Sequence, residues 1–161
     1  MPDSRDGLLT VDPVIEAVLH ASRALVAVAA RSLAGAGEDV TLPQYRALVV
    51  LAARGPQSMA ALASALAVNP STATRMCDRL VRKGLVRRRA SPSDRRQVRL
   101  AMTVAGRRLV DDVTERRRAE IARIVGAIPP PLQAQVVGAL DAFATAAGEL
   151  TDQDWAAGWA I

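Results

Sequence analysis

Along most of the chain, apolar residues recur at the three- and four-residue spacing of α-helices, and capping residues, glycines and prolines separate the segments. Asp12-Pro13 predicts the start of a first helix with Asp12 as its N-cap, and Gly35 and Gly37 predict its end. Thr41-Leu-Pro-Gln44 has the spacing of a capping box, so it predicts a second helix, which Gly55-Pro56 ends.

Two shorter helices are expected next. Ser58 predicts the N-cap of a third helix, whose apolar residues at i, i+3, i+4 and i+7 begin at Met59 and finish at Leu66. Asn69-Pro70 repeats the signal of a cap followed by proline and predicts a fourth helix, which Gly84 ends.

The pattern then changes to that of a β-hairpin. Val98, Leu100 and Met102 alternate with more polar neighbours, as in a half-buried strand, and residues 85–89 are the expected partner strand. Ser91-Pro-Ser-Asp94 supplies typical turn residues between the two strands.

Two further helices complete the predicted order. Thr103 predicts the N-cap of a long helix that reaches about Ile128. Three prolines from Pro129 separate it from a last helix that reaches about Gly148, and a short tail with Trp155 and Trp159 follows. A helix, a short helix, another helix and a hairpin in this order indicate a winged helix-turn-helix.

Composition agrees with a mainly helical protein. Half of the 161 residues are apolar but only 2% are aromatic, and the predominance of Ala, Val and Leu favours helices. We expect no apolar run of the length that spans a bilayer and no signal peptide, and the single cysteine excludes an intrachain disulfide framework. These features indicate a cytoplasmic protein without a membrane partner.

Positive charge is concentrated in residues 69–102. Ten basic residues and two acidic ones give this segment a net charge of +8, whereas the rest of the chain carries −3. A charge excess confined to one helix and one hairpin is typical of a nucleic-acid-binding surface. A solvated basic face is the alternative explanation.

The fourth helix has two distinct faces on a helical period. Ala73, Met76, Cys77 and Leu80 form an apolar stripe that we expect to pack on the third helix. Arg75 is long enough to reach a guanine edge. The remaining candidate contacts to phosphates or base edges are Ser58, Asn69, Ser71, Thr72, Thr74, Arg79 and Arg82.

The predicted turn of the hairpin carries a second candidate contact. Arg96 can enter a narrow, negative minor groove, and Asp94 is the acid that we expect to orient its guanidinium. Arg95 would then contact phosphate. An ordinary surface turn with an incidental ion pair is the alternative.

These segments resemble the MarR family of bacterial transcriptional regulators. The resemblance lies in residues 74–89, in Ser91-Pro-Ser-Asp-Arg-Arg96, in Val98-Arg-Leu100 and in Leu42-Pro-Gln-Tyr-Arg-Ala-Leu48. It implies a homodimer that places two recognition helices one DNA turn, about 34 Å, apart on a pseudo-palindrome. It also implies the wing roles of Asp94 and Arg96, and often an effector between the dimerisation helices and the DNA-binding region.

The apolar faces of the first, fifth and sixth helices support the expectation of a dimer, because one chain offers too little to cover them. Near the junction with the DNA-binding region, His20, Tyr45 and Arg46 are candidate effector contacts. A buried tyrosine with a satisfied hydroxyl is the commoner explanation for Tyr45.

Other chemistry has little support in the sequence. Cys77 falls on the apolar stripe, so we expect a core residue, and peroxide-sensing relatives carry their cysteine in the first helix, where this chain has none. One histidine and one cysteine cannot build a zinc site, although carboxylates could contribute to a weaker one. We therefore expect no cofactor, no metal and no enzymatic activity.

Together these patterns predict a mainly α (α+β) protein, a winged helix-turn-helix with flanking dimerisation helices. The winged helix-turn-helix would occupy residues 41–103, the helical dimerisation region 11–40 and 104–148, a flexible N-terminus 1–10 and a tail 149–161. The predicted function is that of a homodimeric regulator, a repressor that a small organic ligand releases from double-stranded DNA. A sequence-tolerant architectural DNA-binding protein is the main alternative, and an interaction module without a DNA role is a third.

Overall fold

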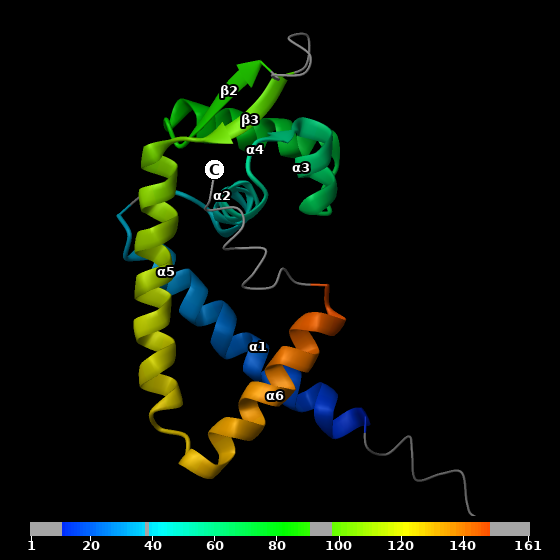
Figure 1. Ribbon diagram of the computed structural model, residues 1–161, viewed down its shortest axis with the longest axis vertical. Coiled ribbons are helices and arrows are strands. Elements are labelled where there is room, and N and C mark those ends of the chain that lie inside the picture. The colour runs from blue at the N-terminus through cyan, green and yellow to red at the C-terminus, as the bar shows by residue number, and fades with distance from the viewer. Residues whose placement is uncertain (1–10, 38, 91–97, 149–161) are drawn as a thin grey trace, which may run out of the picture.

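A computed structural model describes residues 11–37, 39–90 and 98–148. Three long helices form an open framework, and a smaller unit of three helices and a sheet sits at one end of it (Figure 1). The elements are α1 (Val11–Ala34), α2 (Leu42–Arg54), β1 (Gln57–Ser58), α3 (Met59–Ala65), α4 (Pro70–Arg82), β2 (Val86–Ala90), β3 (Val98–Met102), α5 (Val104–Val125) and α6 (Pro130–Ala146). We call α2, β1, α3, α4, β2 and β3 the winged-helix unit, and α1, α5 and α6 the long helices.

Four predicted helix caps are confirmed. Thr41 and Gln44 form a reciprocal capping box, and the side chains of Ser58, Asn69 and Thr103 each accept a hydrogen bond from a backbone N–H of the first turn. These bonds satisfy donors that a helix start would otherwise leave without partners. The sequence therefore placed the starts of α2 to α5 correctly.

The predicted start of the first helix is wrong by at least one residue. Val11 and Asp12 both lie within α1, so Asp12 is an acid in the first turn and not the N-cap. Pro13 is tolerated there because the first N–H groups of a helix have no partner within the helix. Later in the chain, α5 ends at Val125 and is followed by a turn, whereas its predicted end was about Ile128. Helix α6 ends at Ala146, close to its predicted end at about Gly148.

The hairpin is confirmed, and it belongs to a three-stranded antiparallel sheet of order β1-β3-β2. The short strand β1 was not predicted; its Gln57 pairs with Leu100 of β3. The expected alternation along β3 is only partly correct, because Ala101 is buried and Val98, at the far end of the strand, is 54% exposed. Val98 pairs with the exposed Ala90 of β2, at the end of the described hairpin.

The core of the molecule lies in the winged-helix unit. The predicted stripe of α4 is buried and packs against α3, and Leu48 and Leu51 of α2 lie in the same core. Val110 and Val113 extend it into the first half of α5. The unit thus holds α4 in a fixed orientation with one face against the core and the other in solvent.

The long helices contrast with this unit because much of their apolar surface is exposed. The described residues of α6 include none that is buried. Exposed large apolar side chains lie on all three helices: Val14, Ile15, Leu19, Leu25, Val26, Val104, Ile124, Leu132, Val137, Leu140 and Phe143.

One helix contradicts the expectation that no segment is long and apolar enough to span a bilayer. Residues 12–34 of α1 pass that test of length and composition, with a mean hydropathy of 1.5 and 6% of the tested window buried. The many alanines raise the hydropathy although single polar residues interrupt the pattern. This helix therefore leaves most of its apolar surface exposed in the single chain.

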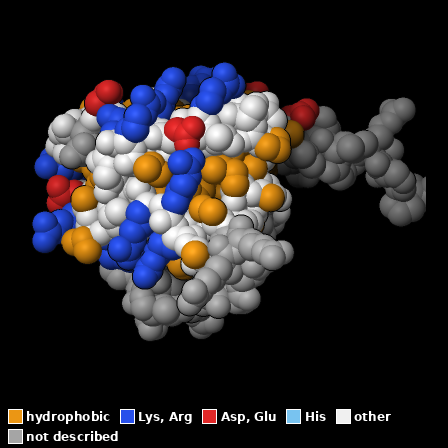
Figure 2. Space-filling view, turned by 90° about the horizontal axis from the view of Figure 1, so that it is seen from above, with side chains coloured by type: hydrophobic (Ala, Val, Ile, Leu, Met, Phe, Trp, Pro, Cys, Tyr) orange, Lys and Arg blue, Asp and Glu red, His pale blue; other side chains and the backbone are white. Residues whose placement is uncertain are grey.

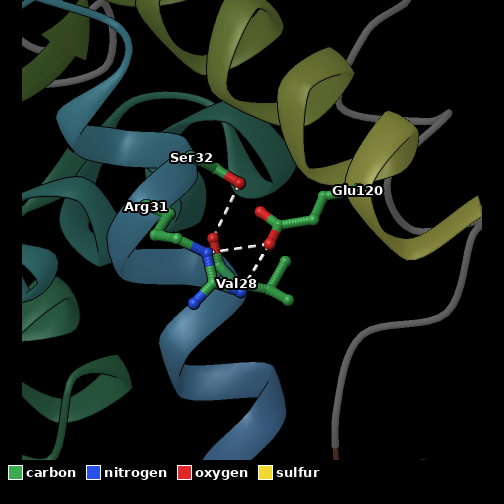
Figure 3. A network of polar contacts seen from close by, with 4 residues as sticks. All are labelled: Val28, Arg31, Ser32 and Glu120. Atoms are coloured by element: carbon green, nitrogen blue, oxygen red, sulfur yellow. Dashed lines mark hydrogen bonds and ion pairs between the residues drawn. The ribbon is translucent and has the colours of Figure 1, made fainter. Parts of the chain in front are cut away.

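An ion pair fixes α1 against α5. The Arg31 guanidinium of α1 donates through Nε and Nη2 to Oε1 of Glu120 on α5, and the Nε–Oε1 distance is 2.8 Å (Figure 3). The hydroxyl of the next residue, the buried Ser32, donates to the carbonyl of Val28, one turn earlier in α1. The ion pair holds the C-terminal part of α1 beside α5, whereas the Ser32 bond lies within α1.

Candidate DNA-binding surface

Helix α4 presents its polar face to solvent, as its pattern predicts. Arg75, Arg79 and Arg82 are exposed, while the opposite stripe is buried in the core. Viewed from the end of the molecule that carries the winged-helix unit, basic side chains are spread across the surface, with a few acidic ones among them (Figure 2). This arrangement can present several guanidinium groups to a polyanion at once.

Hydrogen bonds within the first turn occupy the polar side chains at the start of α4. Oδ1 of Asn69 accepts from the Thr72 N–H and from the Ser71 hydroxyl, both at 2.8 Å. The Thr74 hydroxyl donates to the Pro70 carbonyl at 2.9 Å. In this conformation Ser71 and Thr74 offer acceptor oxygens, so donation to a phosphate requires their hydroxyls to rotate.

The predicted residue Ser58 lies at the start of α3. Its hydroxyl oxygen accepts from the Ala61 N–H at 3.2 Å, and its side chain is half-buried. The structure therefore shows the capping role, and its backbone also pairs with Arg99 of β3.

The strands of the hairpin add exposed arginines next to α4. Arg87 and Arg89 of β2 are exposed, and Arg88 forms an ion pair with Asp78 of α4, with 2.5 Å between Nη2 and Oδ1. This pair was not predicted, because its members lie ten residues apart on different elements. The predicted wing residues Asp94, Arg95 and Arg96 lie outside the described residues.

The three candidate effector contacts do not lie in one environment. Tyr45 is buried, whereas its neighbour Arg46 and the distant His20 are exposed. A hollow of about 460 Å³ lies beside the first half of α5, and none of the three lines it; its described lining is Ala36, Ala105, Arg108, Leu109, Asp111 and Asp112.

The structure instead pairs Tyr45 with a residue that the sequence reading missed. The Arg117 guanidinium of α5 lies 5.6 Å from the centroid of the Tyr45 ring, within cation–π range. Its Nε is buried and has no hydrogen-bond partner among the described residues. The sequence could have indicated Arg117 by its spacing, because Val110, Val113 and Arg117 lie on one face of a helix, as residues of a buried stripe do.

Cys77 is confirmed as a core residue. It is fully buried, and burial raises the pKa of its thiol to about 11, with a further contribution from Asp78 and an opposing one from Arg88. The thiolate, which is the reactive form, is therefore disfavoured near neutral pH. Among the residues that the structure describes, no cluster of three or more His, Cys, Asp or Glu side chains could hold a metal ion.

Comparison with known proteins agrees with the geometry. Residues 40–98 match the sequence model of the MarR family. The crystal structure of RV1404 from Mycobacterium tuberculosis has 44% sequence identity and a TM-score of 0.82, covering 94% of this chain and 99% of that one. CouR from Rhodococcus jostii RHA1, solved with p-coumaroyl-CoA, has 27% identity and a TM-score of 0.61, covering 83% of this chain and 93% of that one.

Two curated relatives from Bacillus subtilis (strain 168) match over shorter stretches. The HTH-type transcriptional repressor MdtR is 34% identical over 86 residues, which are 53% of this chain and 56% of MdtR. The uncharacterised HTH-type transcriptional regulator YhbI is 34% identical over 73 residues, 45% of this chain and 47% of YhbI. The chain thus matches about half the length of each.

Proposed function

Because the chain belongs to the MarR family of transcriptional regulators, we propose that it binds a pseudo-palindromic DNA operator as a homodimer. In this proposal α4 enters the major groove and the wing, the hairpin of β2 and β3, enters the minor groove. The observation that carries it is α4 itself, which is held by a buried stripe and presents three exposed arginines to solvent. Such a regulator acts in the cytoplasm, where its DNA is, and has no enzymatic activity.

The DNA contact proposed for each residue follows from the length of its side chain and from its position in the helix. Arg75 lies in the first half of α4 and reads a base edge, whereas Arg79 and Arg82 lie nearer the end of the helix and contact phosphates. The capped N-terminus, with Asn69, Ser71, Thr72 and Thr74, meets the backbone of the DNA. Ser58 contributes a further phosphate contact at the start of α3.

The wing roles rest on the sequence and on its resemblance to the family. Arg96 enters the minor groove, Asp94 orients it and Arg95 contacts phosphate. The exposed Arg89 and the half-buried Arg99, paired across the hairpin, support this proposal because they bring positive charge to the base of the wing.

Homodimer formation is supported by the exposed apolar surface of the long helices. A second copy, packed on α1 and α6, would remove side chains such as Leu19, Leu140 and Phe143 from water, and a closed two-fold arrangement uses the same surface twice. The same dimer accounts for the hydropathy of α1 without a membrane. Two copies of α4 would then lie about 34 Å apart, one turn of B-DNA.

Control by a small organic ligand is the final part of the proposal. MdtR is a repressor, and CouR was solved with p-coumaroyl-CoA, so proteins similar to this chain include a repressor and a protein that binds an organic compound. Of the candidate contacts, Tyr45 with Arg117 has the strongest support, because the buried Nε of Arg117 can donate to a ligand carboxylate.

Selection of bound sequences from a random duplex pool tests the central claim. We expect a pseudo-palindrome to be enriched and Arg96→Ala to weaken its binding by about 1–3 kcal/mol at fixed salt. Arg123→Ala, on α5 and away from the winged-helix unit, is the charge-matched control and should bind normally. Equal affinity for random duplex and for the enriched sequence would favour the architectural alternative.

A ligand panel tests the control mechanism. Operator release should follow addition of aromatic acids or other small organic compounds, and coupling of about 1–3 kcal/mol corresponds to 5–150-fold weaker DNA binding. Arg117→Gln should remove the response to carboxylates, while Arg118→Gln, its exposed neighbour, should keep it. Release by peroxide that disappears in Cys77→Ser, or release by divalent metals, would contradict the organic-ligand proposal.

A further inference from the structure

One carboxylate lies in the middle of the basic face of α4. Asp78 follows Arg75 by three residues and precedes Arg82 by four, so the three side chains share one face of the helix. Placed against DNA, a free carboxylate there would repel the phosphates that its neighbours attract. Its position therefore requires an explanation.

The partner of Asp78 comes from the wing. Arg88 lies in the middle of β2, where it pairs in register with the buried Leu100, and it shares a face of the strand with the buried Val86. Its side chain thus leaves the face that is directed toward α4, whereas the exposed Arg87 and Arg89 leave the opposite one. Nη2 of Arg88 donates to Oδ1 of Asp78 at 2.5 Å.

This contact links the two elements that are proposed to enter different grooves. Asp78 belongs to α4 and Arg88 to the wing strand, and their side chains are 44% and 48% exposed, so each can still be reached from solvent. A guanidinium bound to a carboxylate has a fixed direction, because its donors lie in one plane. The pair therefore constrains the angle between wing and helix and also neutralises the acid.

We propose that Arg88 is a positioning residue for sequence discrimination, acting through Asp78. The pair holds α4 and the wing at the spacing that one operator geometry requires, and it keeps the Asp78 carboxylate off the phosphates. This inference rests on the proposed function and adds to it a residue whose charge serves orientation and not direct DNA contact.

Two other roles make different predictions. If Arg88 contacts a phosphate, its removal weakens binding to every duplex alike and lowers the salt slope by about one. If Asp78 accepts a hydrogen bond from a cytosine amino group, its loss changes the preferred sequence without any dependence on Arg88.

A double-mutant cycle separates these roles. The proteins are wild type, Asp78→Asn, Arg88→Gln and the double variant, and the readout is the ratio of affinities for the selected operator and a random duplex, across a range of salt. We expect each single change to lower this ratio about 3- to 10-fold and the double change to lower it no further, because both remove the same link. Asp78→Glu, which keeps the carboxylate, should retain most of the ratio.

Arg87→Gln is the matched control, since it removes the same charge from the neighbouring position of β2 without touching the pair. It should weaken both duplexes equally and leave the ratio unchanged. Thermal unfolding of each variant must show that the fold is kept. If a variant unfolds, the conservative variants Asp78→Glu and Arg88→Lys take its place, and hydrogen exchange should show their β2 amides protected as in the wild type.

Additive losses, or an Arg88→Gln variant that behaves like Arg87→Gln, would overturn the inference while leaving the proposed function intact. A lowered ratio for Asp78→Asn alone, with Arg88→Gln normal, would assign direct base reading to Asp78 and would also overturn it. A wild-type protein that does not distinguish the operator from random duplex would contradict the proposed function itself.

Discussion

The winged-helix unit and the long helices differ in how much of their apolar surface the single chain buries. In the unit, Leu48, Leu62, Leu80 and Leu100 are almost completely buried within one chain. In α6, apolar side chains such as Phe143 are about half exposed and no described residue is buried. The winged-helix unit thus buries its apolar side chains within one chain, whereas the long helices leave many of theirs exposed, and in the proposed dimer a second copy covers them.

The largest expected effect tests the core of the unit. Leu80→Ala should lower the free energy of unfolding by about 2–5 kcal/mol, because it leaves a cavity beneath α4. Leu140→Ala on α6 is the matched control and should change the unfolding of an isolated chain by less than about 1 kcal/mol. Denaturant titrations at low protein concentration measure both free energies of unfolding. Equal losses for Leu80→Ala and Leu140→Ala would contradict the difference in burial between the two regions.

The second prediction concerns association. Leu140→Asp should weaken the proposed dimer by about 1.5–3 kcal/mol per copy, because it places a charge in an apolar interface, and should leave the fold of the unit unchanged. Sedimentation velocity over a concentration series measures the shift toward monomer. Asp141→Asn, the neighbouring exposed position, is the control, and an unchanged dimer in Leu140→Asp would mean that α6 is not part of the interface.

Within the DNA-binding surface, Arg75 and Arg82 should differ. Arg75→Ala should reduce discrimination between sequences by about 1–3 kcal/mol, whereas Arg82→Ala should weaken all duplexes and lower the salt slope by about one. Titrations of operator and random duplex at several salt concentrations separate the two effects. Equal losses on both duplexes for Arg75→Ala would show that it contacts phosphate.

Asn69 allows stability and DNA binding to be separated at one position. Asn69→Ala should cost about 0.5–2 kcal/mol of stability, because it removes the cap of α4. Asn69→Asp keeps the cap and should preserve stability, but its negative charge should weaken DNA binding. Thermal unfolding and DNA titration of the two variants check this, and normal DNA binding by Asn69→Asp would place the start of α4 away from the backbone.

The smallest effect is a pH dependence of the core. Since burial raises the pKa of Cys77 from 9.0 to about 11, the neutral thiol contributes stability that is complete below pH 9 and is lost as the pH rises toward 11. Between pH 8 and pH 10 the free energy of unfolding of the wild type should fall by roughly 1 kcal/mol more than that of Cys77→Ala. If the free energy of unfolding falls equally with pH in the wild type and in Cys77→Ala, burial does not raise the pKa of Cys77 as assigned.

The parts of the fold that depend on neighbouring residues could be predicted from the amino-acid pattern. Thr41, Ser58, Asn69 and Thr103 cap helices because a cap needs only a side-chain oxygen and the next turn of backbone. The two faces of α4 likewise follow from its helical period. The expected contacts of Arg75, Arg79 and Arg82 could be proposed from this pattern, and the structure confirms that all three are exposed.

Contacts between residues that lie far apart in the chain could not be predicted in this way. Strand β1 exists because β3 lies beside it, and two residues carry too little pattern to be recognised alone. The pairs Asp78–Arg88, Arg31–Glu120 and Tyr45–Arg117 join residues from different elements, and charge or ring type does not specify a partner. Many apolar side chains of α1 and α6 are exposed in the single chain, and the proposed dimer would bury them. Local hydrogen bonds and periodicity are encoded within a few residues, whereas pairing depends on how whole elements pack.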